Sequence, residues 1–289
     1  MPLNEKTYMG KGNELVVDSD YPKLMKLASV GSEIWVHSDY GDDTGGNGTQ
    51  LAPYKTLNTA WAALTAARNV IMLAPTTTEY TLTASLAAPL FDTFIVGAAG
   101  DPDLAVIGAA VSVTPLISIA PDTLTGTTSY HFVNIAVDNG ETSQIGIQVD
   151  NADAGKKILI YIDGCWFSDG GTSIDVDHDG ASDAVRIYMN SRGREIEGNI
   201  AFDVGNASDK FIASDALFSG TFVTAGDDIA ALFRFANCIV PHGAWASNSG
   251  LTTQEIVCMG CMSVTGTTYA ALDTNELGAG GDFAETIVG

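Results

Sequence analysis

The sequence is short of basic residues and of long hydrophobic runs. It has 13 lysines and arginines against 35 aspartates and glutamates, which gives a formal net charge of −22. Such a chain is poorly suited to nucleic acid, because binding to phosphate backbones needs clustered cations. No apolar run reaches the roughly 18 residues of a membrane-spanning helix, and no hydrophobic N-terminal signal peptide is evident. We therefore expect synthesis in the cytoplasm and neither nucleic acid nor membrane as a partner.

Charged residues of both signs are also scarce, at 17% of the chain, whereas hydrophobic residues make up 46% and glycines number 31. This composition suits many strands and tight turns better than long solvated helices. A length of 289 residues exceeds the usual single core. A solenoid avoids that limit, since its core lengthens with every coil.

A turn-forming residue followed by a small or apolar one recurs in the second half of the chain, at intervals of roughly 22 to 30 residues. The pairs are Asn134-Ile135, Gly164-Cys165, Asn190-Ser191, Asp215-Ala216, Asn237-Cys238 and Gly260-Cys261. Asn, Gly and Asp tolerate positive φ, so each unit should bend at the same place. Alternation of apolar and polar residues around the pairs predicts strands with one buried face.

One strand, one bend and one further strand per period predict an all-β fold, a right-handed parallel β-helix (solenoid). The third unit fits this pattern least well. There, Arg186 takes a position held elsewhere by Tyr130 and Ile160, and Gly193 replaces a bulky residue. The alignment thus places Arg186 on a face that is apolar in the other units.

The four cysteines are explained by the same repeat. Cys258 and Cys261 have the C-x-x-C spacing of redox dithiols and of half a zinc site. Cys165 and Cys238, however, occupy the same place in their units as Cys261. We therefore expect a column of small apolar side chains in the core, with metal or redox chemistry as the alternative.

The N-terminal region, residues 1–33, differs from the rest because it is polar and lacks periodicity. We interpret it as an arm that extends from the body. An alternating strand at 34–37 and a loop of turn formers follow. A helix is then expected near residues 56–68, with Thr56 as its N-cap. This amphipathic helix would cap the open end of the solenoid.

The order of these elements resembles the opening of pectate-lyase-like right-handed parallel β-helix proteins. The resemblance rests on the strand at 34–37, the Gly/Asp-rich loop, Pro53-Tyr54-Lys55-Thr56-Leu57, a helix ending at Arg68-Asn69, and the short strands Val70–Pro75, Phe94–Gly97 and Ala105–Gly108. It implies a β-helix over residues 34–270, followed by a C-terminal tail at 271–289. This superfamily includes lyases, hydrolases, adhesins and non-catalytic proteins of phage particles, so the resemblance leaves the function open.

Fragments of a catalytic pattern are present, but they are incomplete. Asp227 and Asp228, with His242-Gly243 further on, resemble part of the polygalacturonase pattern. The upstream Asn-Thr-Asp triplet and the downstream Arg-Ile-Lys of that pattern are missing. Arg192-Gly-Arg194 is the only close basic pair with one residue between, and no calcium cluster is evident beside it. We therefore predict no catalytic residues and no cofactor.

The metal candidate of the sequence is Asp175, Asp177 and Asp179. Alternate carboxylates followed by Gly180 are similar to the first half of an EF-hand loop, which would hold calcium. Arg186 stands where that loop has its bidentate Glu. The alternative is a strand in which Ile174 and Val176 face inward while the carboxylates face water.

Two classes of function follow from these observations. We expect a structural protein of a bacteriophage particle, either a capsid decoration (cement) protein that binds the major capsid protein or a part of a tail spike or fibre, located in the virion. A polysaccharide-acting lyase or glycoside hydrolase is the alternative. The short Gly-rich C-terminal tail favours the decoration protein, and such subunits often form homotrimers.

The N-terminal arm carries the expected partner-binding residues. Lys6, Lys11, Lys23 and Lys26 are four of only 13 basic residues, so basic residues are concentrated in the arm while the body is acidic. That asymmetry suits an arm that binds an acidic neighbour.

Overall fold

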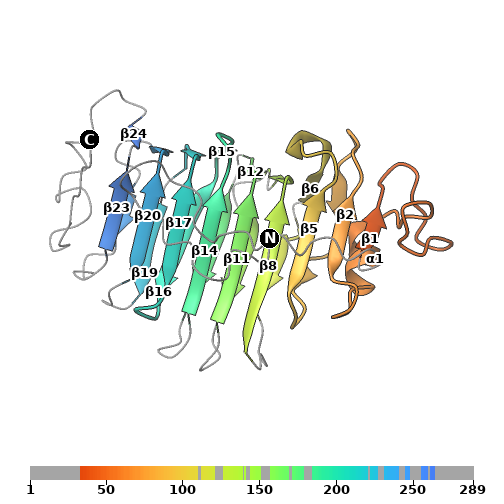
Figure 1. Cartoon of the computed structure of the whole chain (residues 1–289), viewed down its shortest axis with the longest axis horizontal. Helices are drawn as coiled ribbons and strands as arrows, with labels where there is room; N and C mark the ends of the chain where they lie inside the picture. Colours follow the sequence, from red (N-terminus) through yellow and green to blue (C-terminus); the bar gives the residue numbers. More distant parts are fainter. Residues whose placement is uncertain are drawn as a thin grey trace, which may run out of the picture. The chain divides into compact units, whose positions relative to one another are not determined.

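The protein is a β-solenoid of parallel strands with very little helix, seen in a computed structural model (Figure 1). The structure describes residues 33–109, 112–120, 126–138, 140, 144–150, 157–168, 171–178, 184–220, 222–226, 231–240, 245–247, 255–259 and 261–263. The predicted parallel β-helix is confirmed.

Three parallel sheets run along the solenoid in the described residues. The nine-stranded sheet follows the order β1 (Glu33–Val36), β2 (Val70–Leu73), β5 (Thr93–Gly97), β8 (Thr127–Val133), β11 (Lys157–Asp163), β14 (Ala184–Asn190), β17 (Lys210–Ser214), β20 (Leu232–Ala236) and β23 (Glu255–Met259). The two other sheets complete each coil.

The eight-stranded sheet consists of β3 (Tyr80–Leu82), β6 (Val106–Ala109), β9 (Ala136–Asp138), β12 (Trp166–Phe167), β15 (Glu195–Ile196), β18 (Leu217–Phe218), β21 (Ile239–Val240) and β24 (Met262–Ser263). The seven-stranded sheet consists of β4 (Leu86–Ala87), β7 (Ile117–Ile119), β10 (Ile145–Asp150), β13 (Thr172–Asp177), β16 (Asn199–Val204), β19 (Phe222–Gly226) and β22 (Trp245–Ser247). A 3₁₀ turn, η2 (Pro102–Leu104), precedes β6.

From β2 to β22 each coil contributes one strand to each sheet, and the next coil stacks on it in parallel register. In one coil the chain passes from β8 to β9 to β10 and then begins the next coil with β11. Ile162 of β11 pairs with Phe132 of β8 and with Met189 of β14. Stacking therefore brings residues about one repeat apart in sequence into contact.

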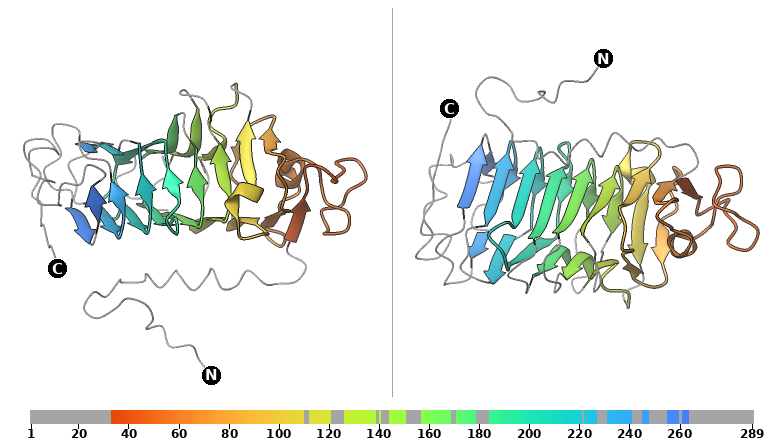
Figure 2. Two further views of the ribbon diagram at one scale, coloured as in Figure 1. Left: turned by 90° about the horizontal axis from the view of Figure 1, so that it is seen from above. Right: turned by 60° about the horizontal axis from the view of Figure 1, so that its bottom comes forward.

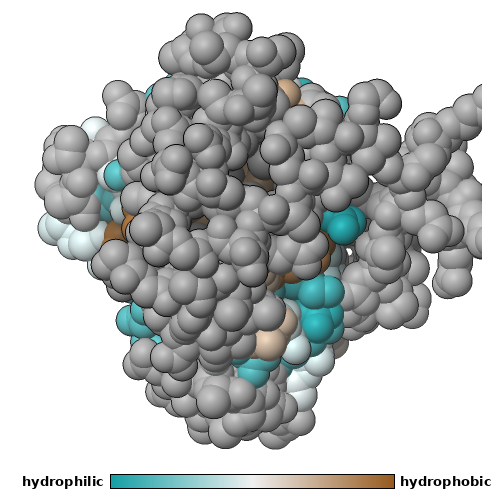
Figure 3. All heavy atoms as spheres, turned by 90° about the vertical axis from the view of Figure 1, so that its left-hand side faces the viewer, coloured by the Kyte–Doolittle hydropathy of each residue, from teal (hydrophilic) through white to brown (hydrophobic). Residues whose placement is uncertain are grey.

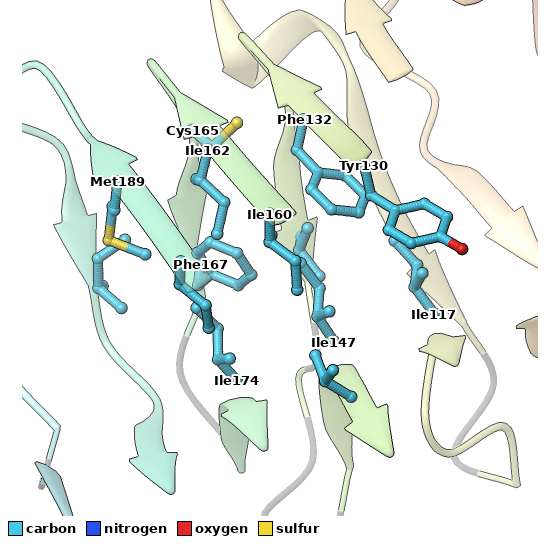
Figure 4. Close-up of a cluster of buried hydrophobic side chains, with 14 of the residues drawn as sticks. Ile117, Tyr130, Phe132, Ile147, Ile160, Ile162, Cys165, Phe167, Ile174 and Met189 are labelled. Carbon is cyan, nitrogen blue, oxygen red and sulfur yellow. The ribbon is translucent and has the colours of Figure 1, made fainter. Parts of the chain in front are cut away.

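The core is a continuous column of apolar side chains along the axis (Figure 4). Ile147, Ile160 and Phe167 belong to the three different sheets, and each is fully buried. Large apolar residues point inward because alternate side chains of a strand lie on opposite faces. This is the inward pattern that the repeat predicted.

The predicted helix forms, but it is shorter than expected. Helix α1 spans Leu57–Ala62, and its N-cap Thr56 accepts a hydrogen bond from the Thr59 backbone. Leu57 and Ala60 are buried in the core cluster. The chain leaves the helix at Ala63, and an antiparallel bridge between Thr65 and Arg68 replaces the expected last turn.

The predicted alignment of the third unit is wrong by one residue. Asn190 pairs with Asp163 and Ser214, which are the last residues of their strands, so Ser191 takes the turn position that was assigned to Asn190. A slip of one residue exchanges the two faces of a strand. Ile187 and Met189 therefore face the core, whereas Arg186 and Tyr188 lie on the outer face.

The limits of the solenoid differ slightly from the prediction. Glu33, which was assigned to the arm, is already the first residue of β1. The rest of the arm and the C-terminal tail lie outside the described residues. No helix in the described part is long and apolar enough to cross a membrane.

The two ends of the solenoid are seen in Figures 2 and 3. At the β1 end, a loop coloured red-orange projects beyond the strands (Figure 2). At the end that carries β23 and β24, the described residues that are visible include hydrophilic and hydrophobic side chains without a single dominant patch (Figure 3).

Candidate functional site

The calcium candidate lies on the outer face of β13. Ile174 and Val176 are buried, whereas Asp175 is half-buried and Asp177 is exposed, so the alternation follows the predicted strand. Asp179 lies outside the described residues. Burial raises the pKa of Asp175, while the Gln148 side chain opposes this shift from 3.4 Å and the nearby Asp177 adds to it. The described residues contain no group of three or more side chains suited to a metal ion.

Next to this strand lies a buried His–Asp pair that the sequence did not indicate. His178 Nδ1 and Asp209 Oδ2 are 2.8 Å apart, and both side chains are fully buried. The carboxylate of Asp209 also accepts backbone hydrogen bonds from Val185, Gly205 and Asn206 at 2.8–3.1 Å. Because it ties the starts of two coils and a loop together, we interpret this pair as a structural clamp.

The polygalacturonase-like fragments cannot be compared with the fold. β19 ends at Gly226, and Asp227, Asp228, His242 and Gly243 lie outside the described residues. The same holds for Lys6, Lys11, Lys23 and Lys26, so their partner-binding role stays a prediction.

Arg192 links three successive coils at one corner of the solenoid. Its Nε donates to Asp163 Oδ1 at 3.0 Å, its Nη2 donates to Asp163 Oδ2, and its Nη1 donates to Asn134 Oδ1 at 3.2 Å. This is the two-pronged geometry in which a guanidinium matches a carboxylate. The cation is therefore engaged within the protein.

Arg194 makes a second contact of this kind. Its guanidinium lies 3.2 Å from Asp101 Oδ1 and 3.6 Å from Asp103 Oδ2, two residues about ninety positions earlier in the chain. Asp103 also accepts a hydrogen bond from the Trp166 indole at 2.7 Å. Arg192 and Arg194, the close basic pair noted in the sequence, thus bind carboxylates of this chain.

A pair of carboxylates meets across a glycine on the outer face of the eight-stranded sheet. Gly108 pairs with Thr81 on one side and with Asp138 on the other. A Cβ added to Gly108 would lie 2.2 Å from the Glu79 carboxylate, which therefore occupies the space above this glycine. Burial, and then the charge of Asp138, raise the pKa of Glu79. No spacing in the sequence connects these residues, which lie in different coils.

The cysteine column of the core is confirmed for the described residues. Cys165, Cys238 and Cys261 are free thiols and are buried. Burial raises the pKa of Cys165 to about 12, and the pKa of Cys238 is raised as well, first by its contact with Cys261 and then by burial. Thiols of this kind are poor nucleophiles, since the thiolate is the reactive form. The Cys258 side chain lies outside the described residues.

An aromatic stack runs across the outer face of the nine-stranded sheet. The ring centroids of Phe94 and His131 are 4.2 Å apart, those of His131 and Tyr161 4.6 Å, and those of Tyr161 and Tyr188 5.1 Å. His131 and Tyr161 are only 1–2% exposed, although they lie on the outer face of the sheet. Tyr188 was predicted on the inner face, and the corrected register brings it into the stack.

These groupings include clamps between coils and two interacting carboxyl groups, Glu79 and Asp138. The fold alone does not assign a function, because one fold supports many chemistries. Comparison of the chain with protein-family models, with curated proteins and with solved structures gives no match.

Proposed function

We propose that this chain is a structural protein of a bacteriophage particle, and more specifically a capsid decoration (cement) protein. The proposal rests on one observation: Arg192 and Arg194 form ion pairs within the chain. Arg192 and Arg194 bind Asp163, Asp101 and Asp103 of other coils. Contacts of this kind stiffen the stack of coils, whereas a lyase or hydrolase needs such groups to be turned toward a substrate.

The remaining described features fit the same role. The buried His178–Asp209 pair joins neighbouring coils, and three free thiols lie in the core. A stiff, acidic body suits a subunit that binds the outside of a shell and stays apart from other particles. The partner is then the major capsid protein, the location is the virion, and a homotrimer is the expected assembly.

Electron microscopy of labelled particles tests this role. Antibody raised against the chain should decorate particles of the bacteriophage whose genome encodes it, in a regular pattern over the shell. Label confined to the tail would support the alternative of a spike or fibre component. Particles that lack the chain altogether would refute a structural role in the virion.

The N-terminal residues are the proposed attachment segment, because Lys6, Lys11, Lys23 and Lys26 balance the carboxylates of residues 1–30, whereas the rest of the chain is strongly acidic. Deletion of residues 1–30 should leave the melting temperature of the isolated protein nearly unchanged and should weaken its binding to particles. Raised salt should reproduce part of that loss if exposed charge pairs contribute. Undiminished binding after the deletion would contradict this prediction.

A polysaccharide-acting enzyme is the second candidate, and the Glu79–Asp138 pair is the observation that favours it. Glycoside hydrolysis needs a general acid with a raised pKa and a second carboxyl group nearby. Glu79 has the raised pKa, and its neighbour Asp138 accepts hydrogen bonds from Ser168 and the Gly140 backbone.

Glu79→Gln separates these two candidates. For an enzyme, the change should abolish release of reducing ends or unsaturated products from a panel of polysaccharides. For a structural protein, no product forms and only the pH dependence of stability changes. Because the folded pKa of Glu79 is raised above its ordinary value of 4.5, stability should rise as the pH falls from neutral toward 4.5. The variant should lack this gain, as urea unfolding at several pH values would reveal.

A further inference from the structure

The strands of the solenoid carry their charges on different sheets. In the described strands every lysine and arginine lies in the nine-stranded sheet, and none lies in the eight-stranded or the seven-stranded sheet. The seven-stranded sheet instead carries Asp150, Asp175, Asp177 and Asp203. A chain with a net charge of −22 thus gathers the cations of its described strands on one sheet.

The cations are closest together on three neighbouring strands, β14, β17 and β20 (Figure 1). Arg186 of β14 pairs in register with Lys210 of β17, and Arg234 lies in the next strand, β20. The three strands contain no aspartate or glutamate. Like charges on neighbouring strands, which are about 4.8 Å apart, repel each other. An anionic partner beside these strands would remove that cost.

These three side chains lie on the outer face of the sheet. Ile187, Phe211 and Phe233 are fully buried in the core, and each cation is the sequence neighbour of one of them. Because alternate side chains of a strand lie on opposite faces, the cations point away from the core. Each of them is half-buried.

Apolar side chains share this surface with the cations. Tyr188 pairs in register with Ile212, and Ile212 pairs with Arg234. In the adjacent row, Leu232 pairs with Lys210. We call this surface the basic face, and it consists of Arg186, Tyr188, Lys210, Ile212, Leu232 and Arg234. A partner that fits it combines carboxylates with apolar side chains.

Arg234 is not satisfied by the described part of the chain. Its Nε is buried and has no hydrogen-bond partner among the described residues. Its register neighbours, Ile212 and Val257, are apolar. Arg192 and Arg194, in contrast, bind carboxylates of other coils. A buried donor of a charged group is costly to leave without an acceptor, so Arg234 calls for a carboxylate from another segment.

Residues 264–289, which lie outside the described residues, have the composition that the basic face requires. They contain Asp273, Glu276, Asp282 and Glu285 and no lysine or arginine. Large apolar residues are interspersed with these carboxylates, among them Leu277, Phe283 and Ile287. Residues 1–32, in contrast, contain four acidic and four basic residues, so their charge gives them no preference for a basic surface.

The acidic segment begins close enough to reach the basic face. Ser263, the residue before it, ends β24 in the coil that begins with β23, and β23 pairs with β20. From β23 to β14 the distance is three strand spacings, or about 14 Å. An extended chain covers about 3.3 Å per residue, so roughly ten residues of the segment would cover twice that distance.

We propose that residues 264–289 fold back over the basic face of the same chain, with their carboxylates paired to its three cations and their apolar side chains packed on Tyr188 and Ile212. The segment then offsets the repulsion among the cations and supplies the acceptor for Arg234. This docking does not depend on the proposed role in a phage particle.

Zero-length carbodiimide crosslinking of the full chain tests the proposal, because the reagent joins a lysine to a carboxyl group only where the two are in contact. Mass spectrometry of the wild type at low salt should find Lys210 joined to one of the four carboxylates of residues 264–289. At about 1 M salt the yield should fall, since screening weakens exposed charge pairs. In a mixture of unlabelled and isotope-labelled protein, both joined peptides should carry the same label, because they come from one chain.

Arg234→Glu should lower the yield of these crosslinks about fivefold, because it removes one cation of the basic face and adds a repulsive charge. Lys55→Glu is the matched control, since it makes the same charge change at an exposed lysine outside the three sheets, and it should leave the yield unchanged. Circular dichroism should confirm that the variants keep the fold. If Arg234→Glu unfolds the protein, Arg234→Gln should lower the yield in the same direction.

Three results would overturn the proposal. The first is an absence of crosslinks between Lys210 and residues 264–289, including the case in which Lys210 is joined only to Asp183, Asp227 or Asp228 of the loops that precede β14 and β20. The second is a set of crosslinks that form only between copies. The third is a yield that Arg234→Glu and Lys55→Glu change equally.

Discussion

Two turns at the same corner of the solenoid differ in length and in what they bury. The turn after β11 passes directly through Gly164 and Cys165 to β12, with Gly164 at φ +64° and Cys165 fully buried. The turn after β14 needs two more residues to reach β15. It has Arg192 and Gly193 at positive φ, and it buries Ser191.

The difference teaches that a solenoid tolerates insertion at a corner when the flanking strands keep their register. β14 still pairs with β11 and β17, and β15 still pairs with β12 and β18. The added residues project outward, where Arg192 binds the coils beside it. The long turn therefore adds a clamp between coils on the outside of the solenoid.

The largest effect is expected in a regular turn. Cys238→Asp should lower the free energy of unfolding by about 3 kcal/mol or more, because an unpaired carboxylate would lose its hydration in the core column. Cys238→Ala should cost about 1 kcal/mol, since it removes one sulfur atom without adding charge. Urea unfolding followed by circular dichroism measures both. Equal tolerance of the two changes would mean that Cys238 does not face the core.

A smaller effect of opposite sign is expected in the long turn. The hydroxyl of Ser191 is buried and has no hydrogen-bond partner among the described residues. Ser191→Ala should therefore stabilise the protein by up to about 1 kcal/mol. Ser129→Ala is the control, because that buried hydroxyl donates to Asp92 at 2.7 Å, and its removal should destabilise. A Ser191→Ala variant that unfolds more easily would show that its hydroxyl is satisfied.

The sequence was sufficient for the fold because the inward faces repeat. Asn134, Gly164, Asp215 and Asn237 all have positive φ, and the residue after each is buried, as the repeat predicted. The prediction was wrong at the long turn after β14. A turn-forming Asn190 stands one residue before the true bend, so aligning the turn residues reversed the faces of β14.

The candidate site was less predictable, because its contacts join residues in different coils. Glu79 and Asp138 meet only when β3, β6 and β9 stack, and the space between them exists because residue 108 is glycine. His178 and Asp209 are brought together in the same way. One sequence shows which residues repeat within a coil, but it does not show which loop residues lie beside each other after stacking.

The smallest expected effect concerns the outer clamp of the long turn. Arg192→Ala should lower the free energy of unfolding by about 0.5 kcal/mol, since the side chain is half-exposed and exposed ion pairs contribute little. Alanine keeps the Cβ at this positive-φ position, so backbone strain is the same in both proteins. Arg192→Lys should lose part of the effect, because lysine cannot bind both oxygens of Asp163 at once. In 1 M salt the difference from wild type should shrink, as screening weakens the pair. An Arg192→Ala penalty that is unchanged by salt would indicate that packing of the side chain, and not its charge, stabilises the long turn.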